Sequence, residues 1–246
     1  MRYARTVKAE FLDRPNRFVA LVRLNGEELH VHVKNTGRCR ELLVPGAEVV
    51  LSESDNPARK YRYDLVAVRK NDLLVNIDSQ APNTLFHEWL LESHAFGQDA
   101  SITPERTHGD SRFDFYIESE GRRIFAEVKG VTLEENGISM FPDAPTARGV
   151  KHIRGLMRAV EEGYEACMVF VIQMSGMKLF VPNESTDPDF SEVLREAYSR
   201  GVGITCLGCS VLEDGIQIDS EVPFDLGRKD HRASSCSRWC PSPPVF

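Results

Sequence analysis

The chain has 246 residues, 41% of them hydrophobic and 27% charged, which suffices for one large core or two modest ones in a globular protein. Its formal net charge is −7, and this acidic balance excludes a uniformly basic surface. Any contact with nucleic acid therefore has to come from local basic patches.

The N-terminal segment carries charged residues throughout and lacks the apolar core of a signal peptide. The longest apolar run, residues 166–172, is too short to cross a bilayer. We therefore expect a cytoplasmic protein with no membrane partner.

The first third of the chain predicts a small β-barrel. Turn signals such as Asn25-Gly26 and Pro45-Gly46 separate five short runs of β-favouring residues, at 6–12, 17–24, 28–34, 47–54 and 61–69. In the third run, Leu29, Val31 and Val33 alternate with histidines, which is typical of a half-buried strand. Five such strands indicate an OB-like barrel domain over residues 1–80.

After residue 80 the pattern changes to helices and strands that alternate. A helical rhythm with Asn83 as the expected cap is followed by strand-like runs at 101–105, 112–118, 123–132 and 138–141. A helix over 146–163, a buried strand, another helix and another strand then follow. This order predicts a mixed sheet flanked by helices over residues 81–227, so the chain is an α/β (α+β) protein of two domains. Residues 228–246, rich in Pro and Ser, are predicted to be a disordered tail.

Four cysteines have a spacing that raises the question of a zinc site. Cys206 and Cys209 form one pair, Cys236 and Cys240 a second, and His231 lies between the pairs. Against a shared metal, Cys206 and Cys209 lie in a strand-like run, where side chains three apart point to opposite faces. The pattern favours reduced thiols and leaves metal binding by the four cysteines open.

Two acidic residues and a lysine lie on neighbouring predicted strands. Glu127 and Lys129 are two apart and share a face, and a Glu120-Gly121 turn predicts a hairpin that brings Asp114 beside Glu127. Adjacent carboxylates are stable together when a divalent cation lies between them, and Mg²⁺ prefers one or two carboxylates plus water. The spacing fits two interpretations equally, a metal site in which Lys129 orients an attacking water or an ion pair at a sheet end.

The arrangement resembles the PD-(D/E)xK nuclease superfamily, although residue 113 is Phe where the name of that superfamily has Pro. The resemblance implies catalytic roles for Asp114, Glu127 and Lys129. It also implies that Asp114 and Glu127 bind Mg²⁺ (or Mn²⁺), with the main-chain carbonyl of Val128 as an extra ligand. Glu88, on the preceding helix, is a further candidate carboxylate.

Longer motifs resemble one particular family. They are "NTGRC" (35–39), "SRFDF" (111–115), "EVKGVTL" (127–133) and "FPDAPTARGVKH" (141–152), in the order found in the sugar fermentation stimulation protein A family. The resemblance covers roughly residues 1–226. It implies an OB-like domain joined to a PD-(D/E)xK nuclease-like domain, DNA as the partner, and a link to the regulation of sugar metabolism, maltose in particular. It does not imply that the site cuts DNA.

Two sets of basic residues are candidate nucleic-acid contacts. The helix over 146–163 carries Arg148, Lys151, Arg154 and Arg158 on one stripe, with His152 beside them as a phosphate contact or proton carrier. The barrel offers a second set, interleaved with tyrosines, which includes Arg38, Arg40 and Arg62. Solvated helix charges and edge-strand charges that prevent aggregation are the structural alternatives.

Three functions therefore compete. The first is a DNA-binding protein whose second domain is a metal-dependent phosphodiesterase (nuclease) or a relic of one. The second is a non-catalytic transcriptional regulator in which the acidic residues are only structural. The third is an enzyme acting on a small sugar or phosphate, with Asp114 and Glu127 as an acid/base pair.

Overall fold

The N-terminal strands form the barrel that the sequence predicts. The computed structural model describes residues 1–35 and 37–227 and arranges the first sheet in the order β3-β2-β1-β4-β5-β6. A parallel pairing of β3 with β5 at His32 and Val33 closes five of these strands into an OB barrel, and the sixth adds to its edge. The strands are β1 (Thr6–Asn16), β2 (Val19–Leu24), β3 (Glu27–Val33), β4 (Glu48–Glu53), β5 (Tyr63–Lys70) and β6 (Leu73–Asn76).

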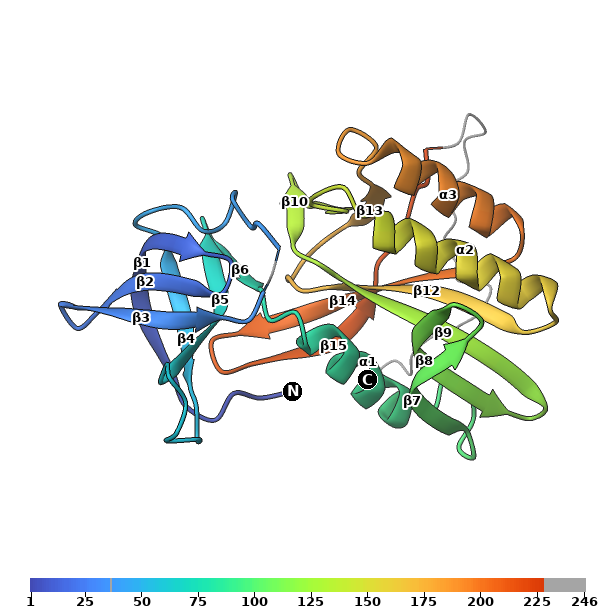
Figure 1. The fold of residues 1–246 in the computed structure, drawn as a ribbon, viewed down its shortest axis with the longest axis horizontal. Coiled ribbons are helices and arrows are strands. Elements are labelled where there is room, and N and C mark those ends of the chain that lie inside the picture. The colour runs from blue at the N-terminus through green and yellow to red at the C-terminus, as the bar shows by residue number, and fades with distance from the viewer. Residues whose placement is uncertain (36, 228–246) are drawn as a thin grey trace.

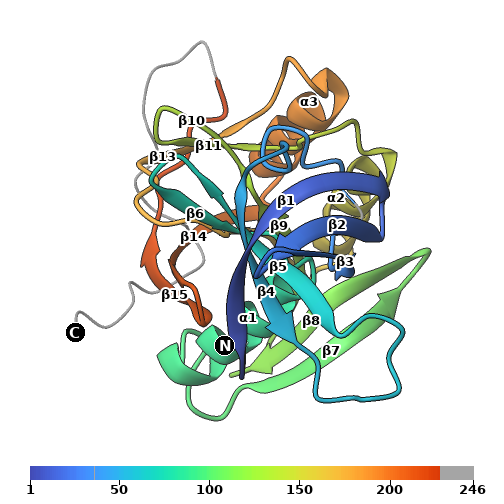
Figure 2. The same cartoon turned by 90° about the vertical axis from the view of Figure 1, so that its left-hand side faces the viewer.

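The second domain is a six-stranded mixed sheet in the order β15-β14-β12-β9-β8-β7. Helices α2 and α3 lie on one face of this sheet and α1 lies on the other (Figures 1 and 2). A three-stranded sheet, β10-β11-β13, adjoins it. The elements are α1 (Ala81–Ser93), β7 (Ser101–His108), β8 (Ser111–Ser119), β9 (Arg122–Val131), β10 (Leu133–Glu135), β11 (Ile138–Phe141), α2 (Ala147–Glu161), β12 (Glu165–Ile172), β13 (Leu179–Pro182), α3 (Pro188–Ser199), β14 (Gly203–Leu212) and β15 (Gly215–Glu221).

The β8–β9 hairpin forms at the predicted turn. Glu120 and Gly121 have φ values of 50° and 80°, and two residues with positive φ make the tight turn that suits the twist of a hairpin. The antiparallel ladder runs from this turn to the pair Phe115↔Ala126 and ends there. Asp114 and Glu127 are the next residues of the two strands, so they lie opposite each other where the strands part. Beyond that point β9 continues in parallel with β12.

The helix starts show one correct prediction and one wrong one. Thr146 caps α2, since its side chain accepts a hydrogen bond from the Gly149 N–H, as the predicted start at 146 requires. Asn83 does not cap α1, because that helix begins at Ala81 with Gln80 as its N-cap residue. Pro82 suits the first turn because its φ is already helical, and this moves the start two residues ahead of Asn83.

The barrel and the second domain share their hydrophobic core. Val66 and Ala67 of β5 pack in one cluster with Leu85 and Phe86 of α1. The start of the chain also lies on the second domain, where Arg2 forms a β-bridge with Gly215. Among the described residues, no helix combines the length and the apolar character that crossing a membrane requires.

The cysteines of β14 are buried on opposite faces of the sheet. Cys206 packs in the cluster on the α2 side and Cys209 in the cluster on the α1 side, so the two thiols do not converge. Burial raises the pKa of both thiols. Cys236, Cys240 and the predicted tail at 228–246 lie outside the described residues.

Candidate metal and nucleic-acid site

Asp114 lies where β8 and β9 separate. One of its carboxylate oxygens accepts a hydrogen bond from the Val128 N–H at 2.8 Å, and the other accepts one from the Asn83 side chain at 2.9 Å. Burial raises the pKa of Asp114, and the nearby negative charge of Glu127 raises it further. The two carboxylates are therefore close enough to repel each other, which is the condition that a shared cation relieves.

Glu127 is the buried centre of the site, with 1% of its surface exposed. Its Oε1 contacts both the Lys129 ammonium and Nδ1 of His152. Burial on its own would raise the pKa of Glu127, but the hydrogen bonds from His152 and Lys129 outweigh it and hold that pKa below the ordinary value. The carboxylate is therefore ionised at neutral pH.

The second oxygen of Glu127 lacks a partner. Oε2 is buried, and no hydrogen-bond donor among the described residues reaches it. A buried carboxylate oxygen without a partner carries a desolvation penalty unless a donor or a cation satisfies it. With Asp114 alongside, the donor set consists of hard oxygen atoms, which suits Mg²⁺, Mn²⁺ or Ca²⁺. Within residues 1–35 and 37–227, no group of three His, Cys, Asp or Glu side chains is arranged to hold a metal ion, so Asp114 and Glu127 are the candidate side-chain ligands.

His152 lies beneath Glu127 instead of on the surface with the basic stripe. Only 7% of it is exposed, its Nδ1 contacts Glu127, and Arg148 approaches its Nε2 at 3.5 Å. The histidine thus holds Glu127 from the α2 side. The prediction of His152 as a phosphate contact beside the basic stripe does not fit this burial, and its partner Glu127 is 25 residues away in the sequence.

Glu88 does not join the other predicted metal ligands. Its carboxylate accepts a hydrogen bond from the α-amino group of Met1 at 2.8 Å. The α1 residue that does reach Asp114 is Asn83, which was predicted to be a helix cap. Val128 lies between Glu127 and Lys129 as predicted and gives its N–H to Asp114. Ligation by its carbonyl stays a prediction.

Gly130, directly after Lys129, leaves room for a buried glutamine. A Cβ atom added to Gly130 would lie 2.7 Å from Cγ of Pro82 and closer still to Oε1 of Gln173, so there is no room for it. Gln173 donates to the Asn76 side chain at 2.9 Å and to the Asp78 carbonyl at 3.0 Å, so it ties the end of β9 to the junction with the barrel.

Replacing Gly130 with alanine should destabilise the protein by about 1–3 kcal/mol, because the new methyl group displaces Gln173 and leaves buried polar groups unpaired. Urea unfolding followed by the fluorescence of the buried Trp89 measures this. An unchanged unfolding midpoint would contradict the close packing of Gln173 on Gly130.

The structure places the predicted cations of α2 together at the surface. Arg148, Lys151 and Arg154 are all exposed, and Lys151 and Arg154 line a pocket of about 560 Å³. Asp110 pairs with Lys151 at 3.4 Å and with Arg158, so it neutralises part of the stripe. For Arg154, no ion pair with another described side chain appears at this surface.

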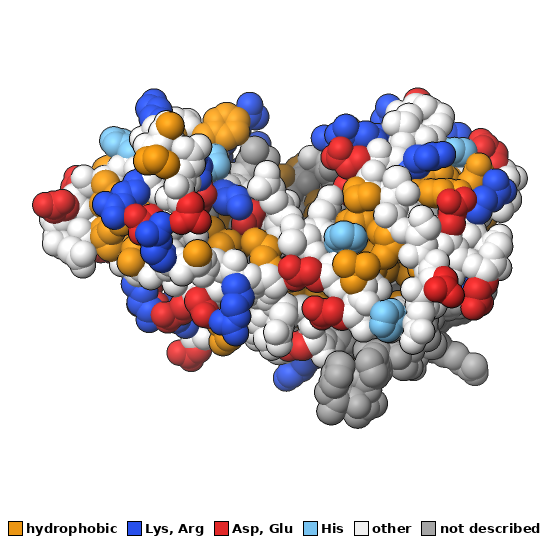
Figure 3. All heavy atoms as spheres, turned by 90° about the horizontal axis from the view of Figure 1, so that it is seen from below, with side chains coloured by type: hydrophobic (Ala, Val, Ile, Leu, Met, Phe, Trp, Pro, Cys, Tyr) orange, Lys and Arg blue, Asp and Glu red, His pale blue; other side chains and the backbone are white. Residues whose placement is uncertain are grey.

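The predicted basic residues of the barrel do not form one continuous patch. Arg38 and Arg40 are exposed in the loop after β3, whereas Arg62 pairs with Glu53 at 2.7 Å. Seen from below, the barrel shows Lys and Arg side chains mixed with Asp and Glu, and the surface is notched between the barrel and the second domain (Figure 3). This intermixing reduces the positive potential that Arg62 contributes.

Comparisons with known proteins cover nearly the whole described chain. Residues 12–77 match the model of the "SfsA N-terminal OB domain", and residues 80–215 match that of the "Sugar fermentation stimulation protein RE domain". A sugar fermentation stimulation protein homolog of Desulfitobacterium hafniense is 53% identical over 226 residues, which cover 92% of this chain and 99% of the relative. A homolog of Ruminiclostridium cellulolyticum is 48% identical over 92% of this chain and 100% of its own length.

A solved structure is also similar. It is that of Pyrococcus furiosus SfsA in complex with Ca²⁺, with a TM-score of 0.84 and 30% identity over 92% of this chain and 98% of the other. The likeness extends over both the barrel and the mixed sheet.

Proposed function

The chain belongs to the sugar fermentation stimulation protein family, and from this membership we propose that it binds DNA and hydrolyses phosphodiester bonds at a divalent-cation site formed by Asp114 and Glu127. The observation that carries the proposal is the buried Glu127 oxygen without a partner, beside Asp114 and Lys129. Through binding or cutting DNA, the protein would take part in the regulation of sugar (maltose) metabolism.

The cation proposed here is Mg²⁺ or Mn²⁺. When bound, such an ion polarises a phosphate and makes a coordinated water more acidic. Asp114 and Glu127 would hold it through their carboxylates, with the Val128 carbonyl as an additional oxygen. The Ca²⁺ in the related Pyrococcus furiosus structure supports a preference for hard cations with oxygen ligands.

Lys129 and His152 have separate roles in this proposal. The ammonium of Lys129 has three N–H donors and uses one on Glu127, so the others remain for a water or a phosphate oxygen. His152 keeps the Glu127 carboxylate in place from within the core. Among the cations of α2, Arg148, Lys151 and Arg154 would contact phosphates of the flanking DNA, which makes binding sensitive to salt.

A non-catalytic DNA-binding regulator is the second candidate. The observation in its favour is that Lys129 and His152 already surround the charge of Glu127, as in a structural ion cluster. A test of metal binding distinguishes the two candidate functions, because a divalent cation does not stabilise a purely structural ion cluster.

Replacing Asp114 with asparagine should remove the stabilisation of the protein by Mn²⁺. For the unaltered protein, Mn²⁺ at a hundred times its dissociation constant should add about 2.7 kcal/mol to the free energy of unfolding. Because the amide of asparagine is a weak ligand for a hard cation, Asp114→Asn should show little of this gain. Thermal unfolding at increasing Mn²⁺ concentration measures it.

Asp110→Asn is the matched control, because Asp110 is an exposed carboxylate that pairs with α2 cations outside the site. It should keep the full response to Mn²⁺. If Mn²⁺ stabilises Asp114→Asn as much as the unaltered protein, the cation is bound elsewhere and the proposed site is wrong.

A further inference from the structure

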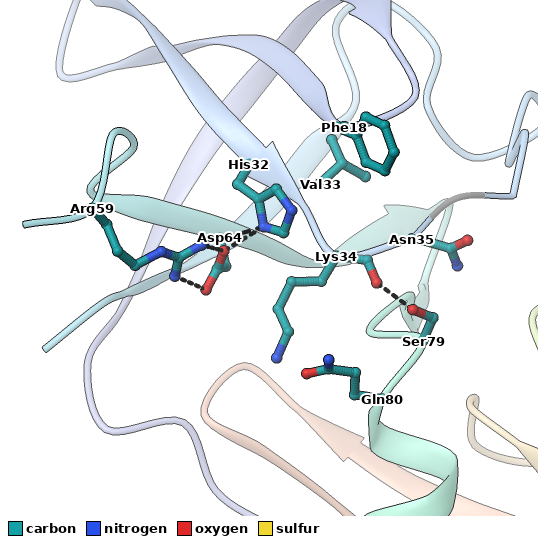
Figure 4. A pocket seen from close by; sticks show the side chains of 9 residues that line it. All are labelled: Phe18, His32, Val33, Lys34, Asn35, Arg59, Asp64, Ser79 and Gln80. Atoms are coloured by element: carbon teal, nitrogen blue, oxygen red, sulfur yellow. Dashed lines mark hydrogen bonds and ion pairs between the residues drawn. The ribbon is translucent and has the colours of Figure 1, made fainter. Parts of the chain in front are cut away.

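A pocket of about 470 Å³ lies between the barrel and the start of α1. β3 contributes His32 to it, β5 contributes Asp64, and the residues that precede α1 contribute Ser79 and Gln80. Figure 4 shows these side chains around a common opening, with Phe18 at its rim. None of them is a predicted site residue.

Phe18 gives the pocket an aromatic wall. Phe18 is 44% exposed, which is high for a phenylalanine. Its N–H donates to the Asn16 side chain at 2.9 Å, and its carbonyl accepts from the Val33 N–H at 2.9 Å, so the backbone is fixed. The guanidinium of Arg17 lies 4.7 Å from the ring centroid. An exposed ring held by a rigid backbone is a surface on which a flat molecule can stack at little entropic cost.

His32 presents a directed polar atom beside this ring. Its Nδ1 lies 2.7 Å from Asp64 Oδ1, and Arg59 holds the same carboxylate through two contacts of 2.7 Å. In the tautomer that donates from Nδ1 to this carboxylate, Nε2 is the ring nitrogen that can accept a hydrogen bond from a ligand. The ring orientation is therefore set before any ligand arrives.

The charges that line the pocket cancel. Arg59 is paired with Asp64, and Lys34 is paired at 2.6 Å with Asp78, which is fully buried. A free phosphate would find no unpaired cation among these groups. An uncharged planar heterocycle that stacks on Phe18 and exchanges hydrogen bonds with His32 and Gln80 suits the pocket better than a phosphate does.

The pocket is close to the candidate metal site. Gln80, in its lining, is the N-cap residue of α1, and Asn83 in the first turn of that helix donates to Asp114. At about 1.5 Å per residue, the two positions are about 5 Å apart along the helix axis. The first turn of α1 therefore connects the lining of the pocket with the candidate metal site.

We propose that this pocket binds an unstacked base of single-stranded DNA, with the base stacked on Phe18 and its edge at His32 and Gln80. The inference rests on the proposed function in one respect, that DNA is the ligand. It adds that the protein engages a strand whose bases are unpaired and that the barrel, not the metal site, holds the base.

Replacing Phe18 with alanine should weaken binding of a single-stranded oligonucleotide about tenfold, because stacking of one base on an aromatic side chain is lost. Binding of a blunt duplex, which relies on α2 cations, should change less than about twofold. Fluorescence anisotropy with labelled 12-nucleotide DNA in EDTA measures both. Val44→Ala, which trims another exposed apolar side chain of the barrel domain, should leave both affinities unchanged.

Photocrosslinking locates the base directly. A single-stranded oligonucleotide with one 5-iodouracil, irradiated with the protein in EDTA, should attach to the peptide that contains Phe18. Attachment elsewhere, or equal single-strand affinity of Phe18→Ala and the unaltered protein, would overturn the proposal.

The two proposals fail separately. If the protein cuts DNA but Phe18→Ala binds single-stranded DNA as tightly as the unaltered protein, the base-pocket proposal is wrong and the metal-site proposal stands. If the oligonucleotide crosslinks at Phe18 but the protein neither binds Mn²⁺ nor cuts DNA, the base-pocket proposal stands and the nuclease proposal is wrong.

Discussion

Replacing Lys129 with methionine should reduce DNA cleavage at least about 100-fold while DNA binding stays within about twofold. Methionine keeps most of the length of the side chain but has no N–H donors, so the water and the phosphate lose a positioned charge-assisted hydrogen bond. Binding survives because the cations of α2 remain. Nicking of supercoiled DNA in Mg²⁺ and anisotropy in Ca²⁺ measure the two effects.

Lys8→Met is the control, since Lys8 is an exposed lysine of the barrel that pairs with Glu213. It should cut at the unaltered rate. If Lys129→Met also cuts at that rate, Lys129 is only the ion-pair partner of Glu127. A urea midpoint measured for both variants separates lost chemistry from lost folding.

Replacing Asp78 with alanine should lower the free energy of unfolding by about 3 kcal/mol. Asp78 is fully buried and its carboxylate is the partner of Lys34 at 2.6 Å, of the Tyr3 hydroxyl at 3.2 Å and of the Gln80 N–H at 3.0 Å. Alanine leaves these donors without their acceptor. The loss is a large share of the 5–15 kcal/mol that stabilises typical proteins.

The matched control is Asp55→Ala, which removes an exposed aspartate that pairs with Arg5 at 2.6 Å. It should leave the urea midpoint unchanged within error, because exposed ion pairs contribute little to stability. If Asp78→Ala also unfolds at the urea midpoint of the unaltered protein, the hydrogen bonds of Asp78 do not hold the barrel on the second domain.

Local signals predicted the parts of the fold that depend on neighbouring residues. The Glu120-Gly121 turn follows from the preference of tight hairpins for positive φ, and the hairpin register then places Asp114 opposite Glu127. The start of α2 predicted at residue 146 agrees with the cap that Thr146 forms. The barrel follows from alternation on strands such as β3.

Distant contacts could not be predicted in the same way. His152 and Glu127 meet only because α2 packs on β9, and no local pattern encodes that pairing. Glu88 and Asn83 both lie on α1, but the rotation of the helix on the sheet selects Asn83 for Asp114. The strand β13, which the sequence pattern does not predict, forms through its parallel pairing with β11, far earlier in the chain.

The apolar cluster that joins Val66 and Ala67 to Leu85 and Phe86 affects how the protein can be divided. Cutting the chain near residue 80 would expose apolar side chains on both fragments, and such surfaces promote aggregation. The two halves matched by separate family models are therefore not free-standing modules. Experiments on the barrel or on the metal site belong in the intact chain, with point substitutions in place of truncations.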